Sequence, residues 1–438
     1  MFKTIANAFR DKEIRKRILL TLLMLAIFRL GAYIPIPGLD VAALNAENSI
    51  TDGSFFGIIA AINGTFGSQG TIFSLGIMPF INSFIIMQLV TIIVPKLERM
   101  SKEGEEGRKK ITQITRYVAI ALAVVQAFGF VMSWGDNFTG LFGTGVANKW
   151  LSRIMTVIIL TAGSTFVMWL GERITEYGIG NGTSLIIFIG ILSGIGSSLI
   201  NAIQTMAGQS GDTSALMGSV WWFIGFILFV IVLFFFIVYV DMAERRIPVR
   251  YAKQVKGNKM YGGQTSNIPM KVNASGVMPI IFASSFLMFP QMIASFWEGS
   301  DFYNWYARWL GVNGYIYIPV LCLLILFFSY FYAQIQFNPI EVSKNIQQYG
   351  GFIPGIRPGK PTSEYLAKIN NRITLFGAIF LAIIALIPSI LVAVMPQELG
   401  LTNAFSATGL LIVVSVALET NKQMESQIMM KTYKGFLK

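Results

Sequence analysis

The chain has 438 residues, of which 54% are apolar and only 13% are charged, against about 25% charged residues in an ordinary soluble domain. So few charged groups cannot cover a water-facing surface of this size, which excludes an ordinary soluble protein. The sequence has no histidine and one cysteine, Cys322, so it forms no internal disulfide. It also shows no catalytic constellation and no phosphate-binding loop, and we expect neither enzyme activity nor a bound metal or cofactor.

Ten segments are long and apolar enough to cross a membrane, which takes about 20 mostly apolar residues. We therefore predict an all-α polytopic membrane protein with ten transmembrane helices. The predicted spans are residues 18–36, 71–95, 113–134, 152–171, 182–203, 219–240, 274–295, 315–336, 373–395 and 404–420.

The basic residues, which give the net charge of +12, alternate along the chain. They gather in every second connection: the N-terminal tail, 96–111, 172–181, 241–272, 337–372 and the C-terminal tail. The opposite connections hold only Lys149 and Arg308, with Arg153 at a helix start. Because lysine and arginine collect on the cytoplasmic side, this alternation predicts that both termini are cytoplasmic. A wrong number of spans would break the alternation.

The ten predicted spans divide into two halves, residues 1–203 and 219–438, joined by an outer connection at 204–218. Five spans per half give the halves opposite orientations in the membrane. Such halves are typical of inverted repeats around a central path. No clear repeat is visible in the sequence, so this prediction rests on the count of spans.

The segment 55–64 is apolar but far too short to span the membrane. It lies in an outer connection, directly before the second span, and glycines bound it. Two predictions stay open from the residues alone. The segment is either a re-entrant half-helix surrounded by protein or an interfacial helix on the outer leaflet.

Several motifs together resemble one family. Each alone is weak, but they occur in order over nearly the whole chain. They are 33–38 (YIPIPG), 75–81 (LGIMPFI), 102–117, 178–182 (GIGNG), 271–285, 337–339 with 350–359 (GGFIPGIRPG), and 410–414 (LLIVV). With the same number of spans, they closely resemble SecY, the channel subunit family of the bacterial Sec protein translocase.

The resemblance implies an hourglass channel in the bacterial plasma membrane. It would pass unfolded preproteins and open sideways to lipid between the second and third and the seventh and eighth spans. A ring of branched aliphatic side chains would seal it, at Ile77, Ile81, Ile187, Ile281 and Ile412. A plug at about 55–67 would include Phe55, Phe56, Ile58, Ile59, Ile62 and Gly64. The gate would carry Asn82, Gln88 and Gln126 on one side and Ser284 and Ser285 on the other.

The resemblance also implies cytoplasmic partners for the two long basic loops. The family docks the ribosome and the SecA motor ATPase there. Arg245, Arg246, Arg250 and Arg357 match its basic positions, and Lys259 is a further expected docking residue. Where the family often has two arginines, this chain has Asn258 and Lys259. Further implied partners are the SecE and SecG subunits, signal sequences and membrane lipids.

Simpler interpretations of the same residues remain open without the family. An isoleucine in an apolar helix is usually packed, a polar group there often bonds within its own helix, and basic loops also bind anionic lipid. A secondary transporter would share the symmetry of spans, but it usually carries charges near mid-membrane, where this sequence is nearly charge-free. An ion channel would need a selectivity-filter run or a ring of acidic residues, and neither is apparent.

Overall fold

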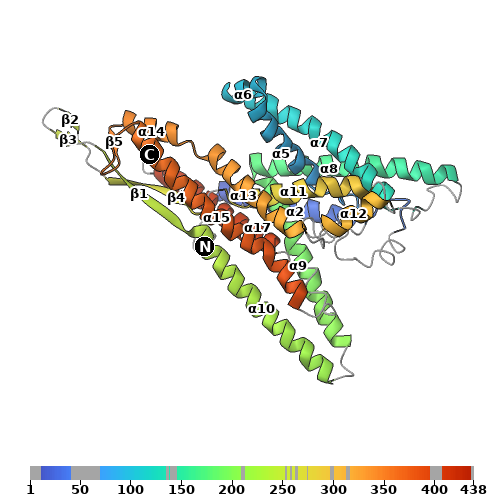
Figure 1. Cartoon of the computed structure of the whole chain (residues 1–438). Coiled ribbons are helices and arrows are strands. Elements are labelled where there is room, and N and C mark those ends of the chain that lie inside the picture. The colour runs from blue at the N-terminus through green and yellow to red at the C-terminus, as the bar shows by residue number, and fades with distance from the viewer. Residues whose placement is uncertain are drawn as a thin grey trace. The chain divides into compact units, whose positions relative to one another are not determined.

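The computed structural model is mostly α-helical (Figure 1). Its helices and strands form two compact units. One comprises residues 1–222, 285–317 and 391–438, and the other 223–284 and 318–390. The structure describes residues 11–40, 70–134, 138, 146–208, 213–251, 254–256, 259–261, 265–273, 275–295, 300–311, 316–394 and 407–435.

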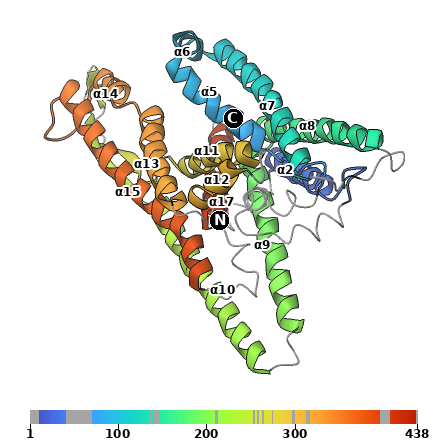
Figure 2. The ribbon, with the colours of Figure 1, turned by 45° about the vertical axis from the view of Figure 1, so that its right-hand side comes forward.

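The first unit consists of helices. They are α2 (Lys12–Gly31), α5 (Met78–Ile93), α6 (Pro95–Lys102), α7 (Glu105–Ser133), α8 (Val146–Tyr177), α9 (Gly182–Gly208), α12 (Asp301–Trp309) and α17 (Ala407–Gly435). Helix α8 packs against α2, α7 and α9, while α5 packs on α7 and α17 packs on α9. Figure 2 shows α5 and α7 as neighbours joined through α6. Between α5 and α6 the chain bends by 101°, and Pro95 begins α6 because it has no backbone N–H to donate.

The turn between α8 and α9 brings two backbones unusually close. A Cβ atom on Gly182 would collide with the backbone carbonyl of Gly171. The turn is further held by the Thr175 hydroxyl, which accepts the Gly182 N–H at 2.9 Å, and by Asn181 Oδ1, which accepts the Thr183 N–H at 3.1 Å. Only glycine at position 182 therefore allows α9 to start where it does.

Gly182→Ala should destabilise the protein by about 1–3 kcal/mol, because overpacking against a backbone carbonyl cannot relax by a side-chain movement. Gly196→Ala in the same helix is the matched control, since a Cβ there meets nothing within 4 Å. The measurement is the fraction of monodisperse protein left after heating in detergent. Equal melting of the two variants would contradict the close approach.

The second unit combines helices with a small antiparallel sheet. Its strands β1 (Glu244–Tyr251), β4 (Thr265–Lys271) and β5 (Gly351–Phe352) lie in the order β4-β1-β5, and β2 (Gln254–Lys256) pairs with β3 (Lys259–Tyr261). Helix α14 (Pro339–Gln348) belongs to this unit, and so does α15 (Lys360–Val394) up to residue 390. Helices α10 (Thr213–Met242), α11 (Met278–Ser295) and α13 (Tyr317–Gln336) run from one unit into the other.

The positions of the described helices can be compared with the ten predicted spans. Each of the ten predicted spans overlaps one helix, but the helices often extend further: the third begins at Glu105 and the tenth ends at Gly435. Within the described residues, six helices are long and apolar enough to cross a membrane, or seven if the bent pair α5 and α6 counts as one. The chain is thus a multi-pass membrane protein, and the number ten stays a prediction.

The prediction of an all-α protein was incomplete. The connection 241–272, expected as a loop, contains α10 to Met242 and then the paired strands β1 and β4. Alternation between buried and exposed residues in β1 runs over only a few residues, with a proline at 248. Proline is unfavourable in a central strand, so the sequence did not indicate a strand here.

A short pattern occurs twice in the chain with the same backbone geometry. Gly76-Ile77-Met78-Pro79 leads into α5 and Gly276-Val277-Met278-Pro279 leads into α11. Both glycines have positive φ, 55° and 61°, a conformation that glycine adopts without strain. Each helix then begins at the methionine, with proline as its second residue. This local repeat was not recognised in the sequence, and it pairs Ile81 with Ile281 at equivalent positions.

Candidate functional site

The described parts of 241–272 and 337–372, the two loops predicted to be cytoplasmic and to bind partners, form a folded platform in the second unit. Strand β1 pairs with β4 from Glu244 to Arg250 and with β5 at Arg250 and Tyr251. Buried residues from β1, β4, α14 and α15, together with the residue directly after β5, form one hydrophobic cluster: Ile247, Val249, Met270, Ile346, Ile353, Leu366 and Ile369. Two loops distant in sequence are therefore one structure, which the sequence did not predict.

The predicted docking arginines of β1 are all exposed. Because side chains alternate along a strand, Arg246 and Arg250 share the face opposite Ile247 and Val249, whereas Arg245 lies on the other face. Arg246 donates from Nε and Nη2 to Glu244 Oε1 at 2.9 and 2.8 Å. This ion pair offsets part of the positive charge at the start of the strand.

Arg357 lies in the turn that joins β5 to α15, and its side chain is exposed. Its carbonyl accepts the Thr362 hydroxyl at 2.8 Å, while the Ser343 hydroxyl of α14 donates to the Gly359 carbonyl at 2.8 Å. In the part of the chain that the structure describes, Arg357 makes no ion pair. A fixed backbone thus presents a guanidinium able to bind a carboxylate or phosphate.

Lys259, the remaining predicted docking residue, lies in β3, where its backbone pairs with Lys256. The structure does not describe its side chain. Sequence reasoning found the basic residues of these loops but missed the sheet that orders them, since the signal for β5 is only two residues long.

The predicted pore isoleucines lie on several helices. In the first unit Ile77 directly precedes α5, Ile81 lies in α5, Ile187 in α9 and Ile412 in α17, and their exposed fractions are only 1–6%. Helices α9 and α17 contact each other, and Ile77 Cδ1 lies 3.4 Å from the position that a Cβ on Gly171 would take. Ile281 lies in α11, in the second unit, and is half-buried. Their role as a ring stays a prediction.

The predicted gate residues are described, whereas the predicted plug is not. Asn82 of α5 and Gln126 of α7 are buried, at 1% and 4% exposure. Ser284 donates to the Ile281 carbonyl of its own helix at 3.0 Å. Among the described residues, Asn82 Oδ1 and the Ser285 hydroxyl are buried without a hydrogen-bond partner. The plug residues Phe55, Phe56, Ile58, Ile59, Ile62 and Gly64 lie outside the described residues.

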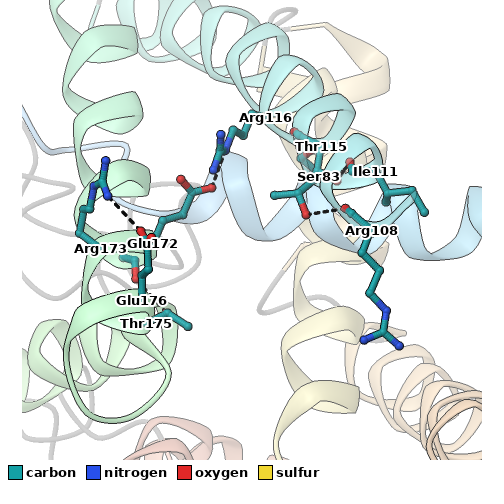
Figure 3. Close-up of polar contacts among 11 residues, drawn as sticks. Ser83, Arg108, Ile111, Thr115, Arg116, Glu172, Arg173, Thr175 and Glu176 are labelled. Atoms are coloured by element: carbon teal, nitrogen blue, oxygen red, sulfur yellow. Dashed lines mark hydrogen bonds and ion pairs between the residues drawn. The ribbon is translucent and has the colours of Figure 1, made fainter. Parts of the chain in front are cut away.

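Two polar contacts join the helices beside the predicted gate. The Ser83 hydroxyl of α5 donates to the Thr115 carbonyl of α7 at 2.6 Å. Arg116 of α7 and Glu172 of α8 form an ion pair with 2.7 Å between Nε and Oε1. Figure 3 shows both contacts at the same end of α7. They tie α5, α7 and α8 together. Sequence reasoning missed them because the partners lie far apart in the sequence and meet only through the packing of the helices.

Asn82 and Ser83 offer a matched comparison. Ser83→Ala should lower stability by about 0.6–1.7 kcal/mol, because it removes a bond between helices in a membrane. Asn82→Leu should leave stability unchanged or raise it, because it removes a buried oxygen without a partner. Heating in detergent followed by size-exclusion chromatography measures both. A larger loss for Asn82→Leu than for Ser83→Ala would contradict these assignments.

A shallow, mostly open apolar groove lies along α8, with Val124 as its one lining residue from α7. It is lined by Val124, Thr161, Thr165 and Trp169, among others. None of the predicted pore, gate or docking residues lines it. The predicted functional residues therefore lie outside this groove.

Comparison with known proteins identifies the family. A family model described as SecY matches residues 71–421. Protein translocase subunit SecY of Streptomyces galbus is 42% identical over 100% of both chains, and that of Thermus thermophilus is 41% identical over 100% of this chain and 98% of its own.

Solved structures share the fold at lower identity. The structure of a protein conducting channel covers 94% of this chain and 91% of its own, with a TM-score of 0.68 and 20% identity. A yeast Ssh1 complex bound to the yeast ribosome covers 92% of this chain and 88% of its own, with a TM-score of 0.58 and 16% identity. Taken with the sequence matches over the whole chain, these findings show that the protein belongs to the SecY family.

Proposed function

We propose that the protein is the central subunit of a channel that carries unfolded preproteins across the bacterial plasma membrane. It also releases transmembrane segments sideways into lipid. The observation that carries this proposal is the 42% identity over the full length to a protein translocase subunit SecY. The same fold in a protein conducting channel supports it.

The proposed architecture has ten transmembrane helices in two inverted halves, 1–203 and 219–438, with both termini cytoplasmic. The repeated pattern at Gly76 and Gly276 supports two related halves, because it places the same turn before the second helix of each. The outer connection 204–218 joins the halves. The segment of about 55–67 is proposed as the plug.

The seal of the channel is proposed to be the ring of Ile77, Ile81, Ile187, Ile281 and Ile412. Branched aliphatic side chains exclude water and ions when closed and give a passing chain no strong binding site. Asn82, Gln88, Gln126, Ser284 and Ser285 form the proposed sideways gate. Membrane hydrogen bonds of about 0.6–2 kcal/mol each suit a latch that an apolar signal sequence replaces.

The platform of the second unit is the proposed site for cytoplasmic partners. Its exposed arginines suit the phosphates of ribosomal RNA or the carboxylates of the SecA motor. The ribosome-bound Ssh1 complex has the same fold, which supports a ribosome contact. SecE and SecG are the further proposed subunits. The proposed channel has no enzyme activity of its own, and since the sequence has no phosphate-binding loop, its energy comes from an ATPase motor, from translation or from the proton gradient.

A secondary transporter of a small solute is the alternative, and the full-length family match disfavours it. Photo-crosslinking separates the two. A crosslinker at Ile81, Ile187 or Ile412 should capture a preprotein arrested in transfer. Crosslinkers at Ile231 and Phe235 of α10, which are 50% and 69% exposed, serve as lipid-facing controls. Capture at the controls and not at the isoleucines would exclude the proposed path.

A further inference from the structure

Helix α12 carries two stripes of exposed side chains. Phe302, Trp305 and Trp309 are 50%, 53% and 39% exposed, and their i, i+3, i+7 spacing puts them on one face. Asp301, Asn304 and Arg308 are also exposed. Each precedes a member of the aromatic stripe by one residue, so the polar stripe lies about 100° around the helix from it.

A third face of α12 packs against α11. Tyr306 is only 4% exposed, and its hydroxyl donates to the Leu287 carbonyl of α11 at 3.3 Å. Leu287 lies eight residues before the end of α11, which is roughly 12 Å along the helix axis. Figure 1 shows α12 beside α11. The short helix therefore lies alongside the last turns of a predicted span.

The other end of α12 is joined to the next span. The Ile316 N–H donates to the Trp309 carbonyl at 3.0 Å, and α13 begins at Tyr317. Exposed apolar side chains continue from α12 onto both neighbours: Phe286 and Ile293 of α11 are 53% and 47% exposed, and Ile316 is 41% exposed. Exposed apolar side chains therefore occur on α12 and also on the adjoining parts of both neighbouring predicted spans.

We propose that α12 is an interfacial anchor whose aromatic stripe lies in the outer leaflet, at the boundary between headgroups and acyl chains. Tryptophan favours this depth because one end of its ring system is apolar and the other donates a hydrogen bond. A helix lying in the membrane plane needs its polar stripe turned toward water, and the exposed Asp301, Asn304 and Arg308 supply such a stripe. The choice of leaflet rests on the topology in the proposed function.

Tryptophan quenching tests the anchor in the full-length protein, reconstituted into vesicles. The signal is the difference in emission between the wild type and the W305F, W309F double variant. Phospholipids brominated near the headgroup should quench most of this difference, and lipids brominated at the chain ends should quench less. Aqueous iodide should have little effect. Asn304→Trp in the double-variant background is the control on the polar stripe, and iodide should quench it.

Two outcomes would overturn the proposal. Quenching of the difference signal by iodide and not by brominated lipid would show that the stripe faces water. Protection from iodide in native membranes but not in vesicles would show that a protein covers it.

The leaflet is tested separately in cells, with Asn304→Cys in a Cys322→Ser background. A membrane-impermeant maleimide should label this variant from outside. Labelling only from the cytoplasmic side would refute the outer leaflet and the proposed topology, whereas the quenching result tests the lipid contact by itself.

Discussion

Replacing Ile81 and Ile187 with glycine should make the resting channel leak ions. Each change removes a side chain whose burial is worth roughly 1.5–3 kcal/mol. If these side chains form the seal, the closed conductance should rise about tenfold or more, since about 1.4 kcal/mol corresponds to tenfold. The measurement is the closed-state conductance in planar bilayers.

Glycine also weakens a helix by about 1 kcal/mol per position, so the control must carry the same cost. Ile92→Gly and Ile200→Gly lie in the same two helices, α5 and α9, at positions that are 49% and 57% exposed. That pair should leave the closed conductance unchanged. Equal conductance of both variants would remove the ring assignment of Ile81 and Ile187.

Charge reversal at Arg357 should abolish most SecA-driven translocation while leaving membrane insertion of the protein intact. The backbone of this turn is fixed by the Thr362 and Ser343 hydroxyls, so a glutamate there keeps its place and repels an acidic partner. Breaking a hydrogen-bonded charge pair at an interface costs about 2–5 kcal/mol, which predicts a loss of about tenfold or more. The measurement is ATP-driven transport into vesicles.

Two further variants separate local recognition from net charge. Lys344→Glu makes the same change of charge on α14, at an exposed position of the same loop, and it should have a smaller effect. Arg357→Lys keeps the charge but loses the planar fork of donors, and it should fall between the wild type and Arg357→Glu. Normal transport by Arg357→Glu would refute the docking role of this residue.

The sequence was sufficient to locate the long apolar helices, because lipid imposes a simple rule on them, but not the short helices α6, α12 and α14. Long apolar runs are what a helix needs to cross the hydrocarbon core, and basic connections alternate because lysine and arginine collect on the cytoplasmic side. All ten predicted spans overlap described helices. Helix ends were less predictable. Polar residues continue α7 back to Glu105 and α17 on to Gly435, because hydrogen bonding can extend a helix beyond the membrane, where hydropathy carries no signal.

The platform could not be predicted for a different reason. Its sheet joins β1 to β5 across about a hundred residues of sequence, and β5 has only two residues. The arginines of β1 were recognised as basic residues in the sequence. That Arg245 and Arg246 lie on opposite faces could be known only once these residues were seen to form a strand. Likewise the contact of Ser83 with Thr115 depends on how α5 packs on α7.

We propose above all that this chain forms a path for unfolded protein. The most direct test is reconstitution with SecE into vesicles, followed by addition of SecA, ATP and a preprotein. We expect the preprotein to become protected from external protease only when ATP, SecA and this chain are all present. The absence of protected preprotein, although the chain is correctly inserted and SecA binds, would contradict this proposal.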